Sequence, residues 1–385
     1  MTESCEIPDS SGLSIDWLQE KLVERFAGDD NTQILNWSSK RIGLGQGFCS
    51  NIIVVSLKWS CDTTKLPNQV VLKVPNMSAA KKASGDHEWL DEWITVSHRN
   101  ECAAYEFMST IPNLSVPRFY YAQEISDQSQ GVIVMESFAD RSAFVPVLTS
   151  LTLPQILGIV DNLAKIHAHS FEQPDWLERF DPNLDIAQQG FSTIFPHVFD
   201  ILKDYPSYSS MLDPVMEYFS DTTKKDELCL NANKILGLPP VLIQGDMWSS
   251  NLIFERDAAG MASDRLLGIV DWQTARAGCI TEDIVHFIVL SCSTDIRRNR
   301  LDDILLFYYQ KLGQYYTAGS LPFSLEEVRR AFDYLLPNGM FWLVLSVFFW
   351  NHGAAFEIGE GTKEEKTERL LVKCKEVIDD VLKLQ

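Results

Sequence analysis

The chain has 385 residues, of which 45% are hydrophobic and 11% aromatic, so most of it can build buried cores rather than stay disordered. Acidic residues outnumber basic ones by 53 to 33, and the net charge of −20 argues against binding nucleic acid or anionic lipid through a basic surface. This length is typical of about two to three folding units.

The first third of the chain combines helices with β-rich segments. The apolar spacing of residues 13–26 predicts an amphipathic helix with Ser14 as its N-cap. β-Branched residues predict strands at 51–57 and 69–74, and the pattern of 86–108 is helical. A further strand is expected at 132–135, and after residue 138 the periodicity is lost, which indicates a hinge.

The remainder reads mainly as helices, with one β-rich block between residues 240 and 271. The expected helices are 153–169, several between 188 and 236, 281–292, 300–316, 324–335, 339–356 and 363–384. Residues 339–350 are the most apolar stretch, but a membrane-spanning helix needs about 20 residues, so we expect a buried helix and no membrane span. The resulting division is an N-terminal helical extension (1–39), a sheet-rich lobe (40–138) and a larger helical lobe (139–385).

Three glycines lie in a turn between strands, just before the strand predicted at 51–57, in the segment Gly43-Leu-Gly-Gln-Gly-Phe48. Gly43, Gly45 and Gly47 would let a turn approach a phosphate chain closely and direct backbone N–H groups at it. The segment is neither a dinucleotide fingerprint nor a Walker loop, because Phe48 follows and no Lys-Ser/Thr pair closes it. Taken alone, it is better explained as ordinary hairpin-turn chemistry.

A lysine stands inside an apolar strand and a glutamate on the helix that follows it. Lys73 interrupts Val70-Val-Leu-Lys-Val74, and Glu101 could pair with its ammonium and hold it toward phosphate groups. Either residue could instead be solvent-exposed, Lys73 on an edge strand and Glu101 on a helix surface. The assignment of Glu101 therefore depends on that of Lys73.

The β-rich block of the second half holds the most informative motif. Asp246 and Asn251 stand five residues apart in Gln244-Gly-Asp-Met-Trp-Ser-Ser-Asn251, a loop between two short strands. Asp246 could accept the proton of an attacking hydroxyl, and Asn251 could give an oxygen ligand to magnesium. Asp271 ends the next strand, where a carboxylate could join the metal to phosphates. Each residue alone could be a turn cap, but the ordered set favours catalysis.

This set resembles the CHK kinase-like family, which includes ecdysteroid-kinase-like proteins and is related to choline kinases and aminoglycoside phosphotransferases. The similarity is carried by residues 241–254 and 268–273, and it runs from about residue 40 to about residue 300. It implies an α+β, protein-kinase-like fold of two lobes, a small antiparallel-sheet N-lobe and a larger helical C-lobe. It also implies ATP- and Mg-dependent phosphorylation of a hydroxyl on a steroid-, choline- or aminoglycoside-like small molecule.

The same resemblance assigns roles to single residues. Asp246 would be the base, Asn251 and Asp271 the metal ligands, and Glu136 with its neighbours the hinge against adenine. One position departs from the family, which usually has His-Gly-Asp where this chain has Gln244. Glutamine donates and accepts hydrogen bonds without titrating, so a weakly active pseudokinase that binds a ligand or partner is the alternative.

Other residues have simpler expected roles. His167 on a predicted helix is expected to pack and hydrogen-bond, Trp248 to attach the catalytic loop to the large lobe, and Asp283 to favour a helix N-terminus. Residues 171–240 are rich in aromatic side chains and are expected to select the acceptor, which their composition does not identify. A protein substrate is disfavoured because Glu282, soon after Asp271, already reads as helical, leaving no room for an activation segment.

The cysteines and the N-terminus indicate the cellular compartment of the protein. None of the eight cysteines forms a C-x-x-C pair or a Cys/His group at zinc-ligand spacing, as expected for reduced thiols. The acidic N-terminus lacks the basic start and apolar run of a signal peptide. We therefore expect a cytoplasmic protein without nucleic-acid partners; the oligomeric state is not predicted.

Overall fold

The structure is a computed structural model of the 385-residue chain, and it describes residues 6–26, 32–43, 49–60, 65–84, 88–126, 129–180, 196–219, 227–228, 230–357 and 359–384. The chain divides into two units. The first comprises Met1–Thr110 and Val116–Arg141, and the second Ile111–Ser115 and Ser142–Gln385. In this division residues 1–39 fall in the first unit, whose last residue, Arg141, lies three residues after Phe138.

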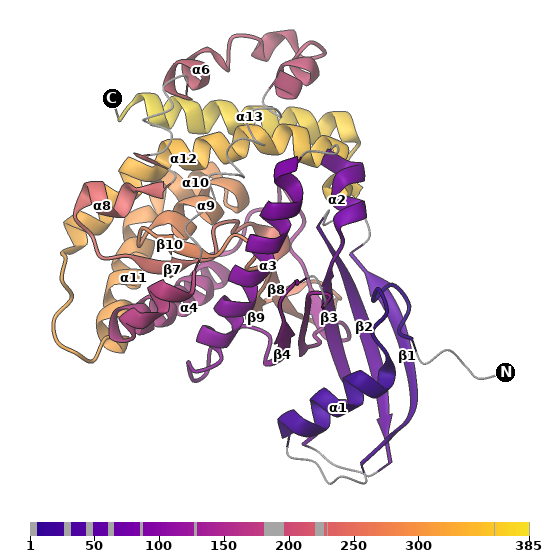
Figure 1. Cartoon of the computed structure of the whole chain (residues 1–385). Coiled ribbons are helices and arrows are strands. Elements are labelled where there is room, and N and C mark those ends of the chain that lie inside the picture. The colour runs from indigo at the N-terminus through magenta and orange to yellow at the C-terminus, as the bar shows by residue number, and fades with distance from the viewer. Residues whose placement is uncertain are drawn as a thin grey trace. The chain divides into compact units, whose positions relative to one another are not determined.

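The first unit is built on a five-stranded antiparallel sheet in the order β1-β2-β3-β5-β4 (Figure 1). Its elements are α1 (Ile15–Phe26), β1 (Ile34–Ile42), β2 (Ser50–Trp59), β3 (Gln69–Pro75), α2 (Met77–Ser84), α3 (Glu88–Met108), β4 (Phe119–Gln123) and β5 (Val132–Glu136). Leu18 and Leu22 of α1 pack with β-branched residues of the sheet into one core. The helices and strands expected in this part are confirmed, while α2, β4 and most of β1, which lies in the segment expected to be a helical extension, were not expected.

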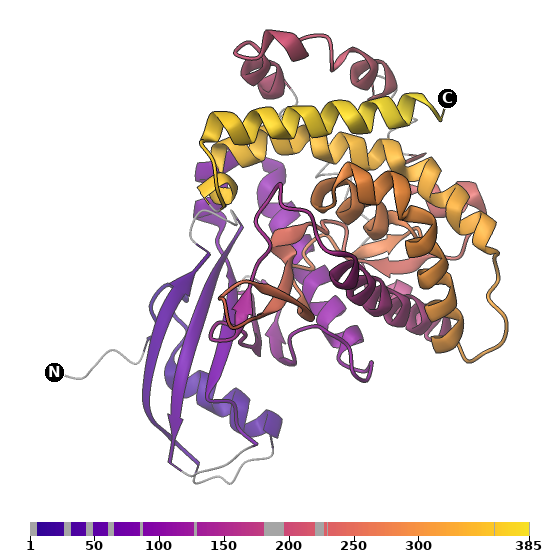
Figure 2. The same cartoon turned by 180° about the vertical axis from the view of Figure 1, so that it is seen from behind.

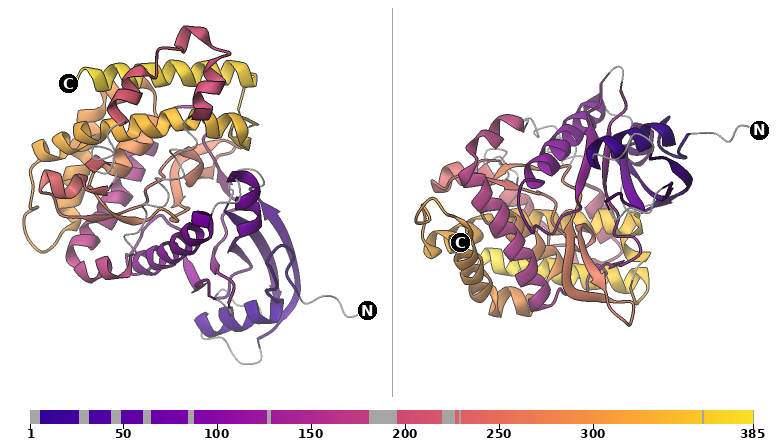
Figure 3. Two further views of the ribbon diagram at one scale, coloured as in Figure 1. Left: turned by 45° about the horizontal axis from the view of Figure 1, so that its top comes forward. Right: turned by 90° about the horizontal axis from the view of Figure 1, so that it is seen from below.

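The second unit is mainly helical and holds two small sheets, β6-β8-β9 and β10-β7. Its elements are β6 (Ser142–Ala143), α4 (Leu153–Glu172), η1 (Pro174–Arg179), η2 (Pro206–Tyr208), α6 (Asp213–Phe219), α8 (Ala232–Leu236), β7 (Val241–Ile243), η3 (Ser249–Asn251), β8 (Leu252–Arg256), β9 (Ala262–Ile269), β10 (Arg276–Gly278), α9 (Glu282–Ser291), α10 (Thr294–Asn299), α11 (Leu301–Tyr315), α12 (Leu325–His352), η4 (Ala354–Glu357) and α13 (Lys363–Leu382). α11 packs along α4, and α12 lies against both α9 and α13 (Figures 2 and 3). A five-stranded sheet followed by a mainly helical part is the protein-kinase-like fold that was expected.

α12 corrects one expectation. The sequence suggested two helices, 324–335 and 339–356, but α12 continues through Pro337 to His352. Proline removes one backbone hydrogen bond from a helix interior, and the loss is offset because Pro337 and most of the residues after it are buried. Among the described residues, α12 alone is long and apolar enough to cross a membrane, but 72% of its most apolar window is buried within the protein, as in a core helix.

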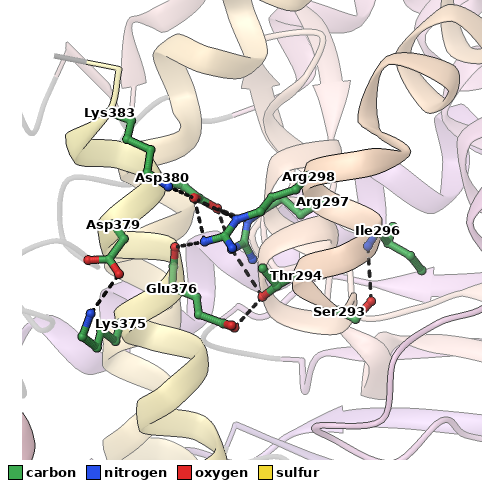
Figure 4. A network of polar contacts seen from close by, with 10 residues as sticks. All are labelled: Ser293, Thr294, Ile296, Arg297, Arg298, Lys375, Glu376, Asp379, Asp380 and Lys383. Atoms are coloured by element: carbon green, nitrogen blue, oxygen red, sulfur yellow. Dashed lines mark hydrogen bonds and ion pairs between the residues drawn. The ribbon is translucent and has the colours of Figure 1, made fainter.

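The C-terminal helix is tied to the unit by a charged cluster between α10 and α13, shown in Figure 4. Arg297 and Arg298 both contact the Asp380 carboxylate, at 2.8 and 2.9 Å. Thr294 donates a hydrogen bond to Glu376 in the same cluster. Because Arg297 is buried, these contacts fix α13 beside α10 more firmly than exposed ion pairs would.

Candidate active site

The first unit holds a buried ion pair. Lys73 lies on β3, between β2 and β5 of the sheet, and its ammonium contacts both Glu101 oxygens at 2.8 and 2.7 Å. Only 8% of the Lys73 side chain and 2% of the Glu101 side chain are exposed. The pairing expected from the sequence is confirmed, and it holds a cation in one position, as recognition of phosphate requires.

The other nucleotide-binding candidates are less fully described. Gly43 follows β1 with a φ of +66°, a backbone conformation that favours glycine, whereas Gly45 and Gly47 lie outside the described residues. Glu136 ends β5, and its carboxylate lies 2.6 Å from Arg141 and 3.7 Å from Arg118. The Glu136 side chain is thus engaged by arginines, so a role for this segment beside adenine would fall to its backbone.

Asp246 and Asn251 are held together by the loop between β7 and β8. The Asn251 amide nitrogen donates to the backbone carbonyl of Asp246 at 2.8 Å and to its Oδ2 at 3.2 Å. No described residue donates to Asn251 Oδ1, which leaves that oxygen for a metal ion. The loop thus orients a carboxylate and an amide oxygen together, as the sequence predicted.

Gln244 connects this loop to the segment that carries Asp271. Its amide nitrogen donates to the carbonyls of Val270 and Asp271 at 3.1 and 2.7 Å, and its amide oxygen accepts the Asp246 N–H at 2.7 Å. Asp271 adopts a φ of +62°, which is unfavourable for a residue other than glycine. Gln244 therefore fixes the strained backbone of one predicted metal ligand and the backbone of the predicted base.

Two residues that sequence reasoning assigned no site role also hold the loop. The buried Asp283 carboxylate accepts the N–H groups of Gln244 and Gly245 at 2.7 and 2.9 Å, and the Thr274 hydroxyl donates to the Gln244 carbonyl at 2.7 Å. Gly245 has a φ of +83°, and a Cβ there would lie 2.8 Å from the Thr274 carbonyl oxygen. The helix-start reading of Asp283 was incomplete, because contacts across about 40 residues leave no local signal.

Negative charge accumulates around Asp246. Burial, reinforced by the neighbouring Asp271 carboxylate, raises the pKa of Asp246 to about 7, against weaker opposing hydrogen bonds from Trp248 and Asn251. Its side chain nevertheless keeps 33% exposure, so a ligand could reach it. The base predicted from the sequence is thus accessible and has a pKa close to neutrality.

The oxygen ligands suit magnesium. Asn251 Oδ1 and the Asp271 carboxylate are hard ligands, and magnesium in phosphotransferases is bound by one or two protein groups plus waters and phosphate oxygens. No cluster of three or more His, Cys, Asp or Glu residues that could hold a metal occurs in the described parts of the chain. The residues fit a magnesium ion that is bound together with a nucleotide.

The remaining predicted residues have structural roles. His167 is buried and shares a 2.7 Å hydrogen bond with Tyr308, and the Trp248 ring stacks on Trp350 of α12 at 5.7 Å. Both expectations are confirmed. Of the segment expected to select the acceptor, residues 181–195, 220–226 and 229 lie outside the described residues, and Trp176 packs against Phe180 in the interior.

The chain matches a protein-family model, two proteins of Caenorhabditis elegans and solved structures. A family model, DUF1679, described as "Uncharacterized oxidoreductase dhs-27", matches residues 20–385. The uncharacterized oxidoreductase dhs-27 of Caenorhabditis elegans is 29% identical over 319 residues, which cover 78% of this chain but 37% of that protein. The uncharacterized kinase-like protein D1044.1 of C. elegans is 21% identical over 86% of this chain and 88% of its own length.

Among solved structures, a choline kinase from Cryptosporidium parvum Iowa II has a TM-score of 0.50 and 12% identity, and the match covers 90% of both chains. At this identity the match shows the fold alone. It confirms the protein-kinase-like architecture expected from the sequence.

Proposed function

The chain belongs to the DUF1679 family and has the fold of choline kinase, and from this premise we propose that it is a small-molecule kinase transferring the γ-phosphoryl group of MgATP to an alcohol. The observation that carries the proposal is the loop in which Gln244 joins Asp246 to the Asp271 segment. A base and two oxygen ligands are held by one hydrogen-bonded frame. This arrangement suits phosphoryl transfer, which depends mainly on positioning and charge stabilisation.

In the proposed reaction each of these residues has a separate role. The Lys73 ammonium, fixed by Glu101, binds phosphate oxygens of the nucleotide. Asn251 and Asp271 hold magnesium, which when bound offsets the negative charge of the phosphates. Asp246 accepts the proton of the alcohol, the alcohol oxygen bonds to the γ-phosphorus, and the bond to the oxygen that leaves with ADP breaks.

The environment of Asp246 suits this role. A general base works best when its pKa lies near the pH at which the enzyme operates, and burial and the Asp271 charge raise the pKa of Asp246 to about 7. An ordinary aspartate would be a weaker base. The acceptor that we propose is a small-molecule alcohol of steroid-, choline- or aminoglycoside-like type.

The alternative of a weak pseudokinase came from Gln244, and the geometry weakens that argument. The Gln244 side chain forms three hydrogen bonds that hold both the base and the metal-ligand segment, so its presence is compatible with catalysis. The word oxidoreductase in the family description refers to a protein of which this chain matches 37%. We therefore retain the kinase as our proposal.

Nucleotide binding provides the test. Calorimetry with the purified protein should detect MgATP binding in the range of about 1 μM to 1 mM that is common for enzyme substrates. Lys73→Met should weaken the affinity for MgATP. Omission of magnesium should weaken ATP binding to the wild type more than it weakens ATP binding to Asp271→Asn. If the wild type bound no MgATP and transferred phosphate to no alcohol in a broad panel, the pseudokinase reading would replace ours.

A further inference from the structure

A histidine that the sequence did not single out lies beside the proposed base. His286, on α9, is 5% exposed, and its Nε2 atom is 3.9 Å from Asp246 Oδ1. This nitrogen is buried without a hydrogen-bond partner among the described residues. Buried polar atoms are almost always paired, so an unpaired one directed at a reactive carboxylate calls for a functional explanation.

The ring of His286 is held in one plane by α12. Trp342 stacks on it with ring centres 5.6 Å apart and an angle of 19° between the planes. α12 comes this close because it has a glycine one turn earlier: a Cβ on Gly339 would lie 2.7 Å from Val285, the neighbour of His286. The stacking limits rotation of the imidazole and so keeps Nε2 facing Asp246.

The other carboxylate oxygen of Asp246, Oδ2, also faces a neutral side chain, that of Asn251. The Asn251 amide nitrogen lies 3.2 Å from Oδ2, while His286 faces Oδ1. Burial, together with the charge of Arg276, lowers the pKa of His286 to about 3, against a weaker opposing hydrogen bond with the Gly245 backbone. The imidazole is therefore neutral near pH 7 and has one N–H, which can be offered to Asp246 without adding charge only if Nε2 carries the proton. The two oxygens of the base therefore face one neutral side chain each.

The distance of 3.9 Å between His286 Nε2 and Asp246 Oδ1 is longer than a hydrogen bond. Either a water molecule bridges the two atoms, or a small movement brings them into direct contact. A bridging water would need access to Nε2, which is buried from solvent. A movement of about 1 Å would instead give a direct bond, and catalytic hydrogen bonds are often long before the substrate binds and tighten afterwards. Direct closure agrees better with the burial of the nitrogen.

Building on the proposed kinase function, we infer that His286 is a positioning residue for Asp246. Its Nε2–H closes onto Oδ1 when nucleotide and acceptor bind, while Asn251 holds Oδ2, so that the carboxylate cannot rotate away from the alcohol. Trp342 and Gly339 contribute by fixing the plane of the ring. His286 does not contact the reacting atoms, and its effect is transmitted through the orientation of the base.

Two matched variants separate the hydrogen bond from the stacking. His286→Phe keeps an aromatic ring against Trp342 but removes the donor, whereas His286→Gln loses the ring but can place an N–H at a similar reach. With MgATP and water as the acceptor, His286→Phe should lower kcat about 100-fold, the effect of misplacing a catalytic group by about 1 Å, with the KM for MgATP unchanged. His286→Gln should recover about tenfold of that loss. Equal losses in both variants, or full activity in His286→Phe, would overturn the inference.

A control is available elsewhere in the same unit. His167 is also buried, and its Nε2 atom has no hydrogen-bond partner, while its Nδ1 atom shares a hydrogen bond with Tyr308. His167→Phe should reduce stability and leave kcat within about twofold of the wild type, since small changes of this size are typical away from the site. A loss of kcat as large as that of His286→Phe would mean that burial of any histidine matters, which contradicts a positioning role.

A second measurement does not depend on turnover. In nitrogen NMR spectra of protein labelled at its seven histidines, with His286→Phe as the assignment, Nε2 of His286 should carry a proton. Its signal should shift in Asp246→Ala. If the wild type transfers no phosphate, the kinase proposal fails while this result still decides whether His286 orients Asp246. An unprotonated Nε2, or a signal unaffected by Asp246→Ala, would contradict the inference.

Discussion

Buried charge is treated differently in the two units. In the first unit Lys73 and Glu101 neutralise each other inside the protein, with side-chain exposures of 8% and 2%. In the second unit burial raises the pKa of Asp246, and the charges of Asp271 and Asp283 raise it further. Arg276, which lies close to Asp271 and Asp283 in the sequence, is paired with Glu282.

The two units thus differ in how they hold buried charge, one as a neutral ion pair and the other as a group of carboxylates. A matched ion pair needs no ligand to balance its charge, and under the proposed kinase function it would present a fixed cation to phosphate groups. The second unit holds excess negative charge on a frame of backbone and amide hydrogen bonds, which is the state that a bound cation would relieve.

The largest effect is expected from breaking the ion pair. Lys73→Met leaves the Glu101 carboxylate buried without a partner and should destabilise the protein by about 3–5 kcal/mol in urea unfolding. The double variant Lys73→Met/Glu101→Leu should recover most of that stability, because a buried ion pair and an apolar pair of similar size are often equivalent. It should not recover MgATP binding. A double variant as unstable as the single one would show that the pair is not balanced internally.

The frame of the second unit can be tested with two glycines that have the same backbone angle. Gly245 and Gly260 both have a φ of +83°, but a Cβ would meet the Thr274 carbonyl oxygen at 2.8 Å only at Gly245, and nothing within 4 Å at Gly260. Gly260→Ala should cost about 1 kcal/mol from the backbone angle alone, and Gly245→Ala about 3 kcal/mol. Thermal unfolding measures both. Equal costs would mean that the loop does not pack tightly on Thr274.

Acidification should affect the first unit through one histidine. Burial, and to a smaller extent Lys73, lowers the pKa of His98 from 6.5 to about 4. Between these values the unfolded chain binds a proton that the folded protein does not, so this stability is complete above pH 6.5 and is lost as the pH falls toward 4. At pH 5 the loss is about 2 kcal/mol.

The matching variant is His98→Gln, whose change in unfolding free energy between pH 7 and pH 5 should be smaller than that of the wild type by about 2 kcal/mol. In the second unit, burial raises the pKa of Asp246 and of Asp283 to about 7, which acts in the opposite direction. Identical pH dependence in the wild type and in His98→Gln would rule out His98 as the source.

The smallest effect is expected at Glu136. Its contacts with Arg118 and Arg141 involve partly exposed arginines, so Arg141→Ala should change stability by less than about 1 kcal/mol. If the backbone of this segment contacts adenine, the MgATP affinity of Glu136→Gln should stay within about threefold of that of the wild type, because exposed ion pairs contribute little. A large loss of affinity in Glu136→Gln would instead show that the carboxylate itself is needed.

The order of motifs allowed much of the site to be predicted. Lys73 stands out because a lysine is unusual within an apolar strand, and Asp246, Asn251 and Asp271 because three polar residues end or join short strands. The larger strands and helices followed from hydrophobic periodicity. These features are local, and local signals are what a single sequence displays.

The rest depends on contacts between distant segments. Asp283 and His286 resemble ordinary helix residues in the sequence. Only the packing of α9 against the loop gives Asp283 its hydrogen bonds and brings His286 close to Asp246. α12 continues through Pro337 because tertiary burial outweighs the local helix-breaking tendency. For Gln244 the sequence indicated the capacity for hydrogen bonds, but the partners of its side chain required the fold.

The central claim is tested most directly by following the γ-phosphoryl group of labelled ATP. A metabolite extract incubated with the wild type and magnesium should yield a labelled alcohol phosphate, identified by mass analysis. Asp246→Asn should bind MgATP with similar affinity yet form that product about 10²–10⁴-fold more slowly. If Asp246→Asn formed it as fast as the wild type, Asp246 would not be the base; if the wild type bound MgATP but labelled no alcohol, the kinase assignment would be wrong.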